Sequence, residues 1–170
     1  MKKQDQTKGR APVPPGAWRA AGDVPRVEVP CMGTAVVAGF PSPAEQYVER
    51  PLDLNELLVA RPAATYFVRA EGDSMLGAGI RSGDLLVVDR SLEPDNGSVV
   101  IACVDGEFTV KTLRKGRGGV RLEAANPAYP PIRFADGMEL RVFGVVTAVI
   151  HRMRTPPAPD GGADAGGRRA

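Results

Sequence analysis

The chain has 170 residues, of which 43% are hydrophobic and 25% are charged, and this length and balance suit one domain with tails better than two domains. The net charge of +2 argues against a strongly electrostatic nucleic-acid binder. Cys31 and Cys103 are too few for a disulfide framework, and no Cys and His residues have metal-ligand spacing. We therefore expect a reducing compartment, no metal and no cofactor.

Both ends of the chain are rich in proline and glycine, and such segments bury too little apolar surface to offset their ordering entropy. The stretch from Thr155 onward is predicted to be a disordered tail. The Pro-rich front arm carries one short apolar segment, TAVVAGF at residues 34–40, which could pair as a strand. No run approaches the ~20 apolar residues of a membrane helix, and the N-terminus lacks the apolar core of a signal peptide. We expect a cytoplasmic protein.

Between the tails, one short helix is predicted within residues 44–60, limited by Pro51 and capped by Asp53 or Asn55. The remaining elements are strands, because they are rich in β-branched residues and separated by turn signals. They are expected at residues 66–70, 84–89, 98–104, 107–113, 120–124, 132–134 and 140–150. The predicted fold class is mainly β, a compact domain of short antiparallel strands that could form part of a barrel.

The strongest local signal is a hairpin in SVVIACVDGEFTVKTL, with Asp105-Gly106 as its two-residue turn. In that register Val104 pairs with Glu107, Ala102 with Thr109, and Val100 with Lys111. Cys103, Phe108, Ile101 and Val110 then share the opposite face.

This register places Lys111 among Val100, Ala102 and Thr109. A buried ammonium costs free energy and tends to lose its proton, so a desolvated lysine can act as a general base. The alternative is an edge strand on which Lys111 points into solvent and prevents pairing with other chains.

A second candidate, Ser74, lies in the Gly-rich stretch EGDSMLGAGIRSGD between two apolar runs. A serine nucleophile needs a positioned base, and the chain has one histidine, His151. Ser74 could instead cap a short helix at MLGAG. A serine at the start of a helical turn would also lie near backbone N–H groups able to stabilise an oxyanion.

The joint pattern of VRAEGDSM, GIRSGDLLVVDR, NGSVVIACVDGEFTVKTL, LEAANPAYPPI and LRVFGVVTAVI resembles the LexA/UmuD family of self-cleaving serine-lysine peptidases, peptidase family S24. The resemblance covers roughly residues 38–154. It implies that Ser74 is the nucleophile and Lys111 the general base, so that no histidine is needed.

The segment from GFPSP to GDSM is most similar to the UmuD branch of this family, which places the scissile bond at Ala38-Gly39. That branch has Cys-Gly at the bond, whereas Ala-Gly is typical of LexA and phage repressors, and the arm here is longer and more Pro-rich. The implied domains are a flexible arm, residues 1–38, removed by self-cleavage, a peptidase-like β domain, residues 39–154, and a disordered tail, residues 155–170.

The resemblance further implies a function in the SOS response. A RecA filament on single-stranded DNA would promote acyl transfer from the Ala38-Gly39 bond to Ser74. The shortened protein, as a homodimer without sequence-specific DNA binding, would then be the accessory subunit of an error-prone UmuC-type Y-family polymerase.

Three alternatives compete with this interpretation. A β module could bind the polymerase without cleavage. A LexA-like repressor fragment would share the peptidase half, but it needs an N-terminal helix-turn-helix that the Pro-rich arm does not predict. A GDSL-type hydrolase would use the GDSM stretch, but its DxxH partner is missing, since Ala148 stands three residues before His151.

Overall fold

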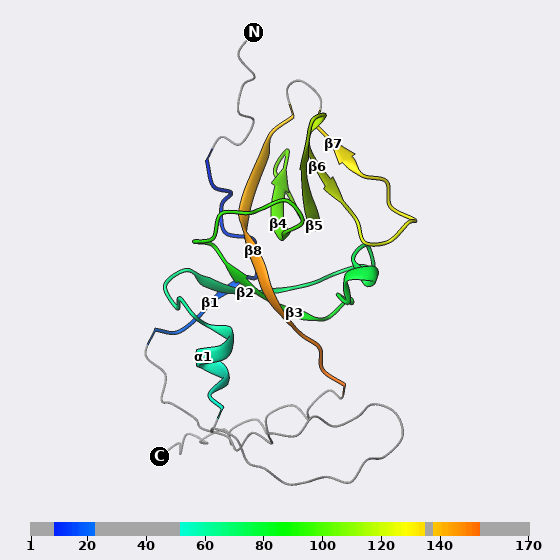
Figure 1. Cartoon of the computed structure of the whole chain (residues 1–170). Helices are drawn as coiled ribbons and strands as arrows, with labels where there is room; N and C mark the ends of the chain where they lie inside the picture. Colours follow the sequence, from blue (N-terminus) through cyan, green and yellow to red (C-terminus); the bar gives the residue numbers. More distant parts are fainter. Residues whose placement is uncertain (1–8, 23–51, 135–137, 154–170) are drawn as a thin grey trace, which may run out of the picture.

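The structure is a computed structural model that describes residues 9–22, 52–134 and 138–153. These residues form one eight-stranded antiparallel sheet in the order β1-β2-β3-β8-β4-β5-β6-β7 (Figure 1). The strands are β1 Trp18–Arg19, β2 Thr65–Arg69, β3 Leu85–Asp89, β4 Val99–Val104, β5 Glu107–Gly116, β6 Gly119–Glu123, β7 Ile132–Arg133 and β8 Leu140–Ile150. The mainly β fold class predicted from the sequence is confirmed.

The long strand β8 joins the two parts of the sheet (Figure 1). It pairs with β4 through Leu140–Val145 and with β3 through Val145–Ile150, with a β-bulge in each ladder. Gly144 lies at the change of partner, where an added Cβ would stand 2.8 Å from the Val88 side chain and 2.9 Å from the Asp89 carbonyl oxygen. The close approach of β3 and β8 therefore requires glycine here.

The alternation of apolar residues along the strands builds two buried clusters. One contains Leu86, Val88, Ile101, Cys103 and Phe143 together with Met75, Ile80, Ala70 and Ala11. The other contains Val100, Ala102, Leu113, Leu122 and Leu140. Both faces of β4 are thus covered, which explains why its sequence is an almost continuous apolar run.

The predicted hairpin between β4 and β5 is confirmed in register, with Val104 opposite Glu107, Ala102 opposite Thr109, and Val100 opposite Lys111. Asp105 and Gly106 have φ values of 48° and 93°, as a tight turn of this length requires. The short helix is also present as α1, Leu54–Leu58, and Asp53 caps it by accepting a hydrogen bond from the Asn55 N–H.

The structure differs from the expectation of a free arm at residues 9–22. This segment lies against the sheet, with β1 paired to β2 and Ala11 fully buried in the first cluster. Three prolines and a strand of two residues gave no periodic signal by which the sequence could predict this contact. Among the described residues, no helix has the length and apolar character needed to cross a membrane.

Candidate active site

Ser74 lies in the turn that leads from β2 into a short 3₁₀ helix, Leu76–Ala78, before β3. The N-cap position of that helix is Met75, and no side chain caps it. The capping alternative for Ser74 is therefore wrong. The Met75 side chain is buried in the core and anchors the turn, while Ser74 stays half-buried at the surface.

The loop that follows β6 makes three hydrogen bonds to the turn that carries Ser74. The Gly77 N–H donates to the Ala125 carbonyl oxygen over 2.7 Å, and Asn126 Nδ2 donates to the Asp73 carbonyl oxygen over 3.0 Å. The Tyr129 hydroxyl donates to the Asp73 carboxylate. These three contacts fix the backbone on both sides of Ser74.

Lys111 reaches Ser74 from β5. It is only 8% exposed, because β5 lies between β4 and β6, so the edge-strand alternative is wrong. Its Nζ lies 2.8 Å from Ser74 Oγ, 2.9 Å from Thr109 Oγ1 and 3.0 Å from the Val110 carbonyl oxygen. The structure thus brings together two residues that are 37 positions apart in the sequence.

Burial lowers the pKa of the Lys111 ammonium from its usual value. No described carboxylate forms an ion pair with Nζ, so the charged form has no opposite charge to offset its desolvation. A neutral amine has two N–H donors and one lone pair. If Thr109 and the Val110 carbonyl accept the two donors, the lone pair is left for the Ser74 hydroxyl.

The hydroxyl of Ser74 borders a pocket of about 480 Å³. The pocket walls are largely apolar, with Val68, Leu86, Ile101 and Phe108 from the sheet. Pro14, Pro15, Gly16 and Trp18 of the N-terminal segment complete the wall. An extended apolar peptide is the kind of ligand that such a pocket accepts.

His151 does not contact Ser74. Its Nδ1 lies 2.6 Å from the buried Asp84 carboxylate, and its Nε2 lies 3.4 Å from the Arg81 guanidinium. Burial alone would raise the pKa of Asp84, but the hydrogen bonds from His151 and from the Arg81 N–H outweigh it and lower that pKa. His151 is thus a strand-end residue that pairs with a buried carboxylate.

The other sequence-predicted positions, Ala38, Gly39 and Cys31, lie outside the described residues. Cys103 is buried in β4 with a free thiol. Among the described residues, no group of three His, Cys, Asp or Glu side chains could hold a metal ion.

Sequence reasoning placed Thr109 beside Lys111 but assigned it no contact. It missed Asn126 and Tyr129 altogether, because a loop contact across more than fifty residues leaves no periodic signal. The proline and asparagine cluster at 126–131 indicated only a loop.

A mainly β domain that holds a serine hydroxyl against a buried lysine is the arrangement expected of a serine-lysine peptidase. The Peptidase S24-like family model matches residues 30–147. The chain belongs to this family.

Three relatives illustrate the similarity. The chain is 54% identical to the protein SamA of Salmonella typhimurium over 118 residues, which are 69% of this chain and 81% of SamA. It is 45% identical to the protein MucA of Escherichia coli over 113 residues, or 66% of this chain and 77% of MucA. The identity to the LexA repressor of Halorhodospira halophila is 38% over 160 residues, or 94% of this chain and 68% of the repressor.

Proposed function

We propose that this protein is a serine endopeptidase that cleaves its own Ala38-Gly39 bond with Ser74 as nucleophile and Lys111 as general base. The observation that supports this most directly is the 2.8 Å contact between Lys111 Nζ and Ser74 Oγ at a buried lysine without a described carboxylate partner. A proton can pass from the hydroxyl to the amine without any intermediate group.

The reaction proceeds in two steps. In the first, neutral Lys111 takes the Ser74 proton, Oγ attacks the Ala38 carbonyl carbon, and the C–N bond to Gly39 breaks as Lys111 returns the proton to the leaving amine. In the second, Lys111 takes a proton from water, hydroxide attacks the ester carbonyl carbon, the bond from that carbon to Ser74 Oγ breaks, and Lys111 passes the proton to Oγ. The product acid of Ala38 releases its own proton to solvent as a carboxylate. The serine regains its proton, and each molecule has hydrolysed one bond.

Charge develops on the Ala38 carbonyl oxygen in both steps and needs hydrogen-bond donors. The backbone N–H groups of Ser74 and Met75 are the nearest candidates by sequence, and no described residue accepts a hydrogen bond from either. The turn is braced through Asp73 and Gly77, so these donors keep their place during the reaction. The apolar pocket suits the TAVVA residues before the bond.

The wider setting of this proposal is the SOS response. A RecA filament on single-stranded DNA stimulates cleavage, and the product that starts at Gly39 forms a homodimer in the cytoplasm. This dimer serves as the accessory subunit of a UmuC-type Y-family translesion polymerase. Support comes from the family membership and from the similarity to SamA and MucA.

The test is to incubate the purified chain with RecA, single-stranded DNA and nucleotide and to measure the masses of the fragments. We expect a new N-terminus at Gly39, and no cleavage in the folded variants Ser74→Ala and Lys111→Ala. Ser98→Ala and Lys115→Ala are matched controls, since Ser98 Oγ accepts from the Asp95 N–H and Lys115 Nζ donates to the Pro94 carbonyl oxygen, and both variants should be cleaved normally. A chain that stays whole under all conditions would favour the alternative of a β module that binds its partner without cleavage.

A further inference from the structure

The N-terminal segment 9–22 is held on the domain by backbone hydrogen bonds at both of its ends. Near the start, the Ala11 N–H donates to the Val142 carbonyl oxygen over 3.4 Å. Near the end, the Ala20 N–H donates to the Thr65 carbonyl oxygen over 2.9 Å, next to the β1–β2 pairing of Trp18 with Phe67. The segment thus adds a short strand to an edge that would otherwise expose unpaired backbone groups.

Burial strengthens this attachment. Ala11 has 0% exposed surface and packs in the main core cluster with Leu86, Val88 and Phe143, while Pro14 is also buried. The prolines of the segment fix φ before docking, so less conformational entropy is lost when the segment binds.

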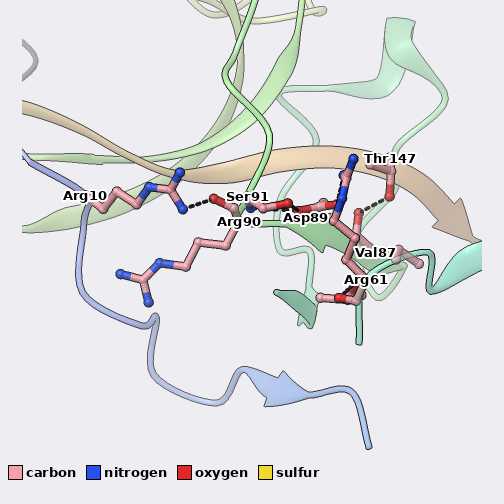
Figure 2. A network of polar contacts seen from close by, with 8 residues as sticks. Arg10, Arg61, Val87, Asp89, Arg90, Ser91 and Thr147 are labelled. Carbon is pink, nitrogen blue, oxygen red and sulfur yellow. Dashed lines mark hydrogen bonds and ion pairs between the residues drawn. The ribbon is translucent and has the colours of Figure 1, made fainter. Parts of the chain in front are cut away.

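Side chains of both the segment and the domain form further hydrogen bonds between them. Arg90 donates to the Ala11 carbonyl oxygen over 3.0 Å while its guanidinium lies 5.2 Å from the ring centre of Phe143. Arg10 reaches back to the Arg90 carbonyl oxygen, as Figure 2 shows. Arg19 donates to the Ala63 carbonyl oxygen over 2.9 Å.

All of these partners lie between residues 63 and 143, on the far side of the proposed scissile bond in the sequence. Hydrolysis of Ala38-Gly39 therefore breaks none of these contacts. We propose that the β2 edge and the Ala11 site form a docking surface on which the fragment 1–38 stays bound after cleavage, so that each processed protomer consists of two chains. The inference rests on the proposed self-cleavage, because the fragment arises only if the bond is cut. Its test does not, because another protease makes the cut.

The test cuts the chain without using Ser74. The Ser74→Ala variant of the full chain receives a recognition sequence for a site-specific protease after Gly39 and is cut completely at micromolar concentration. Gel filtration and native mass spectrometry should then show both fragments in one particle. An N-terminal fragment that elutes alone would overturn the proposal, whereas the proposed self-cleavage would be unaffected by that result.

Two substitutions in the same segment test the docking mode. Ala11→Arg forces a cation into a fully buried site and should weaken retention by about tenfold or more. Val13→Arg makes the same change at a side chain that is 45% exposed and should leave retention unchanged. Equal retention of both variants would contradict the assigned surface.

Thermal unfolding of the uncut chains shows whether Ala11→Arg still folds. If it does not, Arg19→Ala replaces it, because within the described residues this exposed side chain makes one hydrogen bond, to the Ala63 carbonyl oxygen, and it does not pack in the core. Retention that falls in Arg19→Ala supports the proposal, and retention equal to the parent chain contradicts the contribution of the β1 end.

Discussion

The rate of self-cleavage should rise with pH in proportion to the neutral fraction of Lys111. Only the neutral amine can accept the Ser74 proton, and burial holds the pKa of Lys111 below its ordinary value of 10.5. Below that pKa, each unit of pH raises the neutral fraction about tenfold, so the logarithm of the rate rises with a slope near one. The rate should level off before pH 10.5 is reached.

The same shift affects stability. The unfolded chain binds the proton of Lys111 more tightly than the folded chain, so the contribution of this residue to stability is complete above the unfolded pKa of 10.5. It is lost as the pH falls through the lowered folded pKa. The fold must therefore be checked by circular dichroism at each pH at which a rate is measured.

The assay follows the loss of full-length chain without RecA from neutral pH upward. Lys111→Arg keeps a cation at the site, but its guanidinium stays protonated, so cleavage should fall about 10³-fold or more at every pH. Lys115→Arg is the matched control on the same strand, because among the described residues its side chain bonds the Pro94 carbonyl oxygen and not the site. Its pH profile should equal that of the parent chain.

A flat profile with an intact fold would refute the lysine base, and so would normal cleavage of Lys111→Arg. If the cleavage rate instead rose with a midpoint near pH 6.5 and this rise disappeared in His151→Ala, the base would be His151 and not Lys111. The structure argues against that outcome, because His151 is engaged by Asp84.

Three further predictions concern glycine positions and a buried carboxylate. Gly77→Ala should displace the Ser74 turn and slow cleavage, because a Cβ would stand 2.4 Å from the Ala125 carbonyl oxygen, whereas Gly118→Ala meets open space and should cleave normally in the same gel assay. Gly39→Lys should give a chain of normal thermal stability that is not cleaved, since bulk at the bond blocks the approach of the backbone, and its efficient cleavage would place the bond elsewhere. Asp89→Asn should lower the free energy of unfolding at pH 7 by about 1–3 kcal/mol. Burial raises the pKa of Asp89, but bonds from Ser91 and Arg61 outweigh it and hold it below 3.8. The stabilisation is therefore lost as the pH falls through that lowered pKa, and urea unfolding of the variant should depend less on pH below about 4.

The Lys111 environment could be predicted from sequence because the tight Asp105-Gly106 turn fixes the register of the whole hairpin. Once Val104 and Glu107 are paired, every later pair on β4 and β5 follows, including Val100 with Lys111. Burial of this lysine could not be predicted in the same way, because the hairpin alone left an edge strand open, and the pairing of β5 with β6 excludes that alternative. Local turn chemistry therefore determined one half of the candidate site.

The position of Ser74 relative to Lys111 could not be derived in this way. Their contact depends on the crossing of β8, on the bulges in its ladders with β3 and β4 and on the hydrogen bond from Asn126, none of which has a local sequence signature. The family resemblance predicted the pair, and the structure places the two atoms within hydrogen-bond distance. The docking of residues 9–22 was missed because it depends on one small buried side chain, Ala11, and on two paired residues.

The docked segment also changes how the proposed bond reaches its nucleophile. Gly22 and Asp53 line the same pocket, so the chain leaves the described domain and returns to it at one place. Ala38 is 16 residues from Gly22 in the sequence, and such a stretch can span at most about 50–58 Å. The pocket at Ser74 is also lined by Trp18, four residues before Gly22 in the docked segment. Under the proposed self-cleavage, a bond tethered by the chain on both sides is expected to reach Ser74 of its own chain, because closing a loop of this length costs little entropy. We therefore expect the contacts of residues 9–22 to favour the proposed cleavage within one protomer and, afterwards, the proposed retention of the fragment.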